Sequence, residues 1–178
     1  MKIFLTDTQS IVLELTTEIE GKDFDAITCS PRTDDGFGFS LLRFYAGLEL
    51  TPALDSACKA AVARNEVCIL PEELSPKWRV LLTPTLKTRD ESSRAEAHRL
   101  MIDLFNASQA GGVGAQRLLI THFYWVQKYP RQHVIGILDG IRDLRVSGFR
   151  GLKTIGVDIR NLSEHFERDS KEYFSASI

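Results

Sequence analysis

The sequence predicts one α/β domain over residues 1–178, with a central mixed sheet between two layers of helices, a three-layer α/β/α arrangement. Strand and helix patterns alternate from end to end, and neither an internal repeat nor a low-complexity segment interrupts them. No linker long enough to divide domains appears. The length of 178 residues, 43% of them hydrophobic and 26% charged, suits one globular domain with its own core.

The first half of the chain shows strands and helices in turn. A helix is expected from Ser10, because Ile11, Leu15 and Ile19 recur at helical spacing and Gly21 can end it. A second helical pattern breaks where Thr51-Pro52 restarts it. In order, we expect a strand at 2–6, a helix at 10–21, a strand at 24–29, a loop at 30–38, a helical pattern over 40–64 and strands at 66–70 and 78–83.

The second half contains the clearest helix pattern, an apolar stripe from Ala97 to Phe105 that Gly111-Gly112 ends. A second stripe runs from Val134 to Leu144, where Gly136 and Gly140 indicate close helix packing. The remaining expected elements are a buried strand at 118–120, a last strand at 152–158 and a terminal helix capped by Asn161 and running to about Phe174.

Charge and composition exclude several classes of protein. A net charge of −2 gives no electrostatic reason to expect nucleic-acid or membrane-surface binding. No apolar stretch approaches the roughly 20 residues that span a bilayer, and the start lacks a signal-peptide core. Three scattered cysteines predict no disulfide framework, and the four histidines show no metal-ligand spacing. We therefore expect a cytoplasmic protein without a metal or cofactor.

The segment Arg117–Pro130 (RLLITHFYWVQKYP) is the most informative one. Its apolar start is typical of a buried strand, which then opens into aromatic and cationic side chains. Ligands of open α/β sheets bind at the carboxyl ends of the strands. Rings offer stacking faces and Lys128 offers a countercharge for phosphate, so this strand exit predicts a nucleotide-like ligand. Rings that simply cover the core are the alternative, above all for Phe123.

Several fragments occur in a characteristic order. They are Asp7 after the first strand, the strand Asp25–Cys29, Gly36-Phe37-Gly38, the helix end Arg43–Gly47, and Ile120–Pro130 followed by a helix. In order and spacing these parts resemble the macrodomain, the ADP-ribose-binding module. The resemblance spans most of the chain and implies a macrodomain-like fold with a ligand of the ADP-ribose type.

The chain departs from the family at the ligand-binding loops. The family's asparagine pair would fall on Cys29 and Arg32, and the glycines of its second phosphate loop would fall near Trp125 and Lys128. Glycines matter there because only a bare backbone brings N–H groups against a pyrophosphate. Bulky residues must enclose a different ligand or fill the cleft, so a remodelled phosphate loop is expected.

Eight residues are the predicted ligand-binding set. The resemblance implies that Asp7 accepts a hydrogen bond from an adenine amino group, although capping the helix expected after it is an alternative. The end of the last strand would contact the adenosine part. Arg32 could pair with phosphate, or lie on the surface. The set is Asp7, Arg32, Gly36, Gly38, Tyr124, Trp125, Lys128 and Asp158.

Other functions remain open at this point. Gly36 and Gly38 can supply backbone N–H groups at a helix start, or form a simple turn. A degenerate family member could act through a protein partner anchored by the aromatic loop. An ADP-ribosyl hydrolase is a further alternative, so whether the chain is an enzyme stays undecided. A thiol nucleophile built from Cys29 and His122 competes with a buried structural cysteine.

Overall fold

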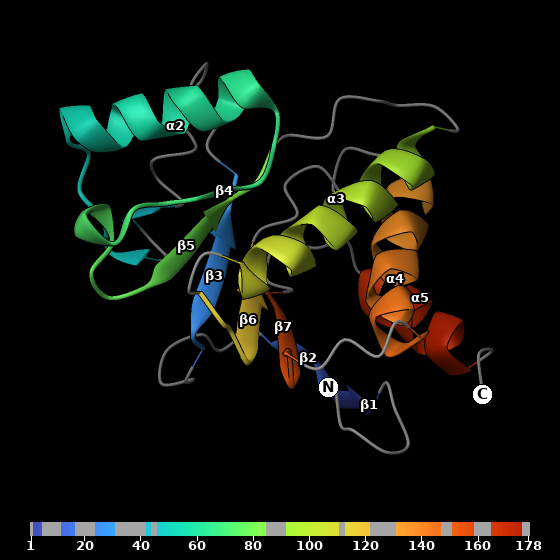
Figure 1. Cartoon of the computed structure of the whole chain (residues 1–178). Coiled ribbons are helices and arrows are strands. Elements are labelled where there is room, and N and C mark those ends of the chain that lie inside the picture. Colours follow the sequence, from blue (N-terminus) through green and yellow to red (C-terminus); the bar gives the residue numbers. More distant parts are fainter. Residues whose placement is uncertain are drawn as a thin grey trace.

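The fold is a mixed seven-stranded sheet with helices on both faces (Figure 1). The computed structural model describes residues 2–4, 12–16, 24–30, 42–43, 46–84, 92–110, 113–121, 131–146, 151–158 and 165–175. The strands are β1 (Lys2–Phe4), β2 (Val12–Thr16), β3 (Ala26–Cys29), β4 (Cys68–Ile69), β5 (Arg79–Leu82), β6 (Arg117–Ile120) and β7 (Thr154–Asp158). The helices are α2 (Pro52–Arg64), the short 3₁₀ helix η1 (Glu72–Leu74), α3 (Ser93–Gln109), α4 (Arg131–Val146) and α5 (His165–Ser175). The predicted α/β class is confirmed.

The strand order, β1-β2-β7-β6-β3-β5-β4, gives the sheet a parallel centre and antiparallel borders. β2, β7, β6, β3 and β5 run parallel to one another, whereas β1 and β4 pair antiparallel with β2 and β5. The five parallel strands therefore end at one side of the sheet, which we call the carboxyl edge. They begin at the other side, the amino edge.

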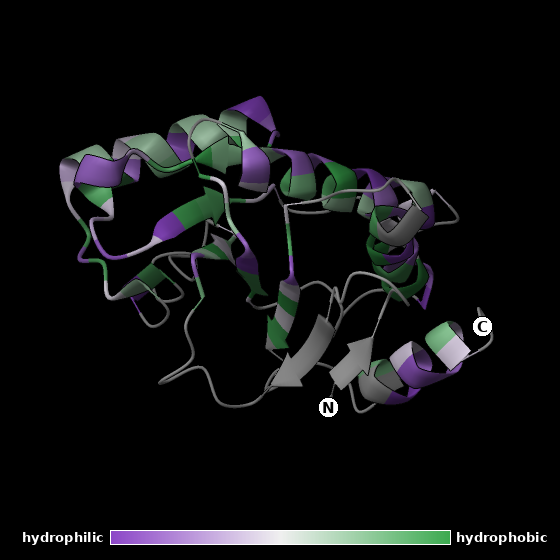
Figure 2. Cartoon of the chain, turned by 60° about the horizontal axis from the view of Figure 1, so that its bottom comes forward, coloured by the Kyte–Doolittle hydropathy of each residue, from purple (hydrophilic) through white to green (hydrophobic). Residues whose placement is uncertain are grey.

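Both faces of the sheet are covered, as the alternation along β6 shows. Leu118 and Ile120 pack in a cluster with α3, α4 and α5, and Leu119 packs in a second cluster with α2. Successive strand side chains point to opposite faces, so a strand buried at every position needs a helix layer on each side. Accordingly, α2 lies on one face and α3, α4 and α5 on the other (Figure 1). The described residues of the central strands are largely hydrophobic in Figure 2.

The predicted helix break at Thr51-Pro52 is confirmed. Leu42, Arg43 and Ala46 are helical, and the turn closes at Gly47, whose φ of 64° is left-handed and whose N–H donates to the Arg43 carbonyl at 3.0 Å. A glycine suits this position because it carries no Cβ. Thr51 then caps α2, its hydroxyl accepting from the Leu54 N–H at 3.2 Å.

The close packing predicted from Gly136 and Gly140 is also confirmed. A Cβ on Gly136 would lie 2.2 Å from the carbonyl oxygen of Arg94, and one on Gly140 would lie 2.4 Å from Cβ of Met101. Hydrogen atoms at these positions let the backbones of α3 and α4 approach each other.

None of the helices in the described part of the chain is long and apolar enough to cross a bilayer.

The helix expected from Ser10 to Gly21 is wrong, because Val12–Thr16 forms β2. This strand pairs with β1 on one side and β7 on the other, so its backbone is bonded from both flanks. Apolar residues four apart, such as Ile11 and Leu15, fit a period of two as well as one of 3.6. Pairing with β1 and β7 therefore makes this segment a strand and not a helix.

Candidate functional site at the carboxyl edge of the sheet

Two neighbouring strands, β3 and β6, send the chain in opposite directions at the carboxyl edge. After β3 the chain passes to the α2 face, where Leu42 and Ala46 pack, and continues to β5. After β6 it passes to the opposite face, where α4 packs, and continues to β7. Such a reversal between adjacent parallel strands is a topological switch point, where α/β sheets form a ligand crevice.

The backbone pairing between β3 and β6 ends before the strands do. The ladder joins Ala26 to Leu118 and Ile27 to Leu119, whereas β3 continues beside β5 as far as Cys29. Side-chain bonds then replace the ladder. The N–H of Thr121 donates to Oγ1 of Thr28 at 3.1 Å, and the Thr121 hydroxyl donates to the Thr28 carbonyl oxygen. Both threonines are buried, so these bonds fix where the two chain segments leave the sheet.

The next strand exit is fixed in a similar way. The N–H of Thr83, just after β5, donates to the Cys29 carbonyl oxygen at 2.8 Å, and its hydroxyl reaches the same oxygen at 3.3 Å. The ends of β6, β3 and β5 therefore form one hydrogen-bonded unit. A site carried by segments leaving this edge has a rigid base.

Cys29 lies in this unit with its thiol buried. Its side chain is buried, 1% exposed, and burial raises the pKa of its thiol to about 12, although a hydrogen bond with Thr121 lowers it in part. The thiolate is the reactive form, so burial disfavours the species that the Cys29–His122 nucleophile hypothesis needs. The buried cysteine is confirmed. His122 itself lies outside the described residues.

Seven of the eight predicted ligand-binding residues end or follow, in the sequence, one of three neighbouring strands. Asp158 is the last residue of β7, where it pairs with Thr16 at the end of β2. The described structure ends at Ser30 after β3 and at Thr121 after β6, and six predicted residues follow those two exits in the sequence. These six lie outside the described residues: Arg32, Gly36 and Gly38 after β3, and Tyr124, Trp125 and Lys128 after β6.

Asp7 differs from the other seven predicted residues. It too lies outside the described residues, but the strand before it, β1, runs antiparallel to β2. Phe4, where β1 ends, pairs with Val12, where β2 begins. The segment that contains Asp7 therefore leaves and rejoins the described chain at the amino edge.

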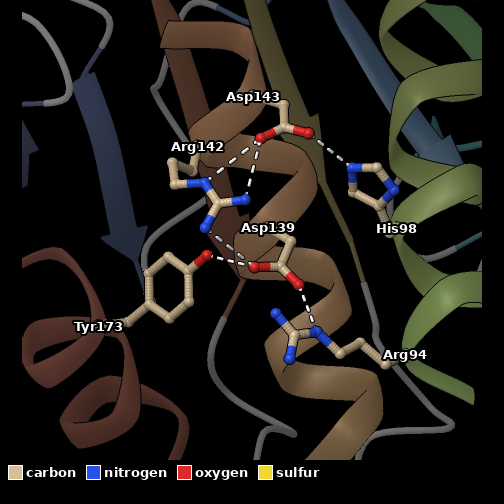
Figure 3. A network of polar contacts seen from close by, with 6 residues as sticks. All are labelled: Arg94, His98, Asp139, Arg142, Asp143 and Tyr173. Atoms are coloured by element: carbon tan, nitrogen blue, oxygen red, sulfur yellow. Dashed lines mark hydrogen bonds and ion pairs between the residues drawn. The ribbon is translucent and has the colours of Figure 1, made fainter. Parts of the chain in front are cut away.

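A polar network holds α4, the helix that follows the aromatic segment (Figure 3). Asp139, 7% exposed in its side chain, accepts from Nε of Arg94 on α3 at 2.6 Å, accepts from the hydroxyl of Tyr173 on α5, and lies 3.4 Å from the guanidinium of Arg142. One turn further along α4, Asp143 lies 2.8 Å from Nε2 of His98. The network therefore joins α4 to both of its helical neighbours.

The neighbours of Asp139 and Tyr173 shift the pKa values of both groups. Burial alone would raise the pKa of Asp139, but hydrogen bonds from Arg94 and Tyr173 and the nearby arginine charges lower it below its usual range. Burial and the bond to Asp139 raise the pKa of Tyr173 to about 12, so the phenol stays protonated and donates.

Sequence inspection missed this network, because its partners are 34 and 45 residues apart and no local spacing marks them.

Solved structures with the same fold are macrodomains of Oceanobacillus iheyensis. One with ADP bound gives a TM-score of 0.64 at 16% identity and covers 100% of this chain and 97% of its own. One with MES bound gives a TM-score of 0.63 at 15% identity, covering 100% of this chain and 98% of its own. No protein-family model matches the sequence, and no curated protein matches it. The chain therefore has a divergent macrodomain-like fold.

Proposed function

We propose that the chain is a binding module for an ADP-ribose-type or other nucleotide-derived ligand, held at the carboxyl edge with a remodelled phosphate loop. The switch point between β3 and β6 is the observation that carries the proposal. There, adjacent parallel strands send the chain to opposite faces and on to opposite sides of the sheet, β3 toward β4 and β5, and β6 toward β7. A macrodomain of the same fold holds ADP, which supports the choice of ligand.

The ligand would lie between the segments that follow β3 and β6. Arg32 and the backbone around Gly36 and Gly38 would bind phosphate, the first by a bidentate contact and the others through N–H groups. On the other side Trp125 and Tyr124 would stack on a flat ring, with Lys128 as a countercharge.

The adenosine end would lie beside the end of β7, where Asp158 can accept a hydrogen bond from an amino group or ribose hydroxyl. Asp7 was predicted for the adenine contact and lies outside the described residues, whereas Phe4 before it and Val12 after it pair with each other at the amino edge. Asp158 is therefore the better supported carboxylate of the two, and Asp158→Asn should weaken binding more than Asp7→Asn.

Isothermal titration with ADP-ribose and ADP tests the proposal. The protein should bind one of them saturably, and Trp125→Ala or Lys128→Met should each lower the affinity roughly tenfold, since a stacked ring or a paired charge contributes about 1–3 kcal/mol. Lys59→Met is the matched control, because Lys59 is an exposed cation on α2 that pairs with Asp55. Absence of heat with every nucleotide would overturn the proposal.

A further inference from the structure

A concave site lies at the amino edge of the sheet, away from the carboxyl edge. A cavity of about 670 Å³ opens where β3, β5 and β6 begin, between Phe24, Trp78 and Arg117. The four residues of β3 separate the two edges by about 13 Å, at roughly 3.3 Å per residue. Its volume lies in the range of small-molecule sites.

The acidic side chains that line the cavity are already bound. Glu72 pairs with Arg79 at 2.6 Å. Asp25 accepts the backbone N–H groups of Gln116 and Arg117, each at 2.8 Å. Both carboxylates therefore have partners other than the side chains of Lys77 and Arg117.

Arg117, which lines the cavity, has no anionic partner among the described residues. Its guanidinium lies over the ring of Phe24, 5.6 Å from the centroid, and forms no ion pair with any described residue. Its Nε is buried and has no hydrogen-bond acceptor within the described part of the chain. A guanidinium presents five N–H donors in a planar fork that matches a carboxylate, and a buried donor without an acceptor is unfavourable.

The cavity lining also includes an aromatic surface and a second cation. Trp78 lines the cavity, with Nζ of Lys77 at 5.9 Å from its ring centroid. In all, three cationic and two acidic side chains line the cavity, which leaves one net positive charge. This balance favours a monoanion over a doubly charged phosphate.

We propose that this amino-edge cavity is a second binding site, which takes a small aromatic carboxylate. The carboxylate would lie in the fork of Arg117 with Lys77 nearby, and the flat apolar part would lie along Trp78. The site is independent of the nucleotide site, because it is formed by the other ends of the strands.

Titration of the full chain with indole-3-acetate tests this site, with the neutral indole-3-acetamide as the matched ligand. The acid should bind saturably and at least about tenfold more tightly than the amide, because only the acid pairs with a guanidinium. Arg117→Met keeps an unbranched side chain over Phe24 and should lose about tenfold in affinity for the acid. Arg99→Met is the control, since Arg99 lies on α3 with its side chain 85% exposed.

Equal binding of acid and amide by the unchanged protein would overturn the proposal without any variant. Undiminished binding of the acid by a folded Arg117→Met protein would do so too, as would no binding of the acid at all. ADP-ribose titrations of the same proteins separate the two sites. Arg117→Met should leave nucleotide affinity unchanged, whereas Trp125→Ala should leave the affinity for indole-3-acetate unchanged.

Discussion

Thr121 bonds Thr28 twice where β6 and β3 leave the carboxyl edge, once through its N–H at 3.1 Å and once through its hydroxyl. The two residues are 93 positions apart and both are buried. They connect the two strand exits that flank the switch point. The base of the proposed nucleotide site is thus held by side chains after the β3–β6 ladder has ended.

Thr121→Val tests this connection, because it keeps the shape of the side chain and removes the donor. The free energy of unfolding should fall by about 1–2 kcal/mol, since a buried carbonyl loses a partner. Urea unfolding measures it. Thr83→Val is the control: its acceptor, the Cys29 carbonyl, keeps the Thr83 N–H at 2.8 Å, so less than half of that loss is expected. Equal losses would contradict the role given to Thr121.

The network around Asp139 should matter more than any exposed ion pair on the same helices. Asp139→Asn should cost about 2 kcal/mol and Tyr173→Phe about 1 kcal/mol, because each removes a charge-assisted bond of the Asp139 carboxylate, whose side chain is 7% exposed. Asp103→Asn breaks the exposed pair with Arg99 and should change stability by less than about 0.5 kcal/mol. Thermal unfolding of the three variants compares them, and a similar small effect for all would count against the network.

Much of the fold was predictable, because most elements carry a pattern that only one structure satisfies. The stripe from Ala97 to Phe105 fits a helix alone, and the helix α3 contains it. The apolar run at 118–120 is too short for a helix and forms β6. The segment around β2 failed because its spacing fits both periods, and its two partner strands begin at positions 2 and 154.

The candidate site was predictable only as far as the strand order. Aromatic and cationic residues after a buried strand indicated a ligand edge, and the parallel register of β7, β6 and β3 brings the predicted exits together. Local sequence could not show that β1 runs antiparallel, which puts Phe4, the last described residue before Asp7, at the amino edge. The buried state of Cys29 likewise depends on α2, which follows it by more than 20 residues.

Gly136→Ala should destabilise the protein even though alanine favours helices. The new methyl group would lie 2.2 Å from the Arg94 carbonyl and 2.9 Å from Cβ of Ala97, so α3 and α4 must separate at a cost of about 1–3 kcal/mol. Gly47→Ala is a useful comparison, because nothing lies within 4 Å and only the left-handed backbone opposes it, at about 1 kcal/mol. A stabilised Gly136→Ala protein, read from its urea midpoint, would contradict the packing of these helices.

Stability should fall as the pH drops through about 6.5, the ordinary pKa of histidine. His133 is buried, and burial lowers its pKa in the folded state. Below the pKa of His133 in the unfolded chain, the unfolded state binds a proton at this imidazole and the native state does not. The free energy of unfolding therefore decreases with falling pH. Urea midpoints between pH 5 and pH 7.5 measure the slope. His133→Leu should flatten it, whereas the lowered pKa of Asp139 acts only in more acidic solution.

Amide chemical-shift mapping of bound ADP-ribose tests the central proposal most directly. Binding at the carboxyl edge predicts shifts at the strand ends Ser30, Thr83, Thr121 and Asp158, while the amides of Arg79 and Arg117 at the amino edge stay in place. Shifts confined to Arg79, Arg117 and their neighbours, or no shifts at saturating nucleotide, would contradict a ligand site at the switch point between β3 and β6.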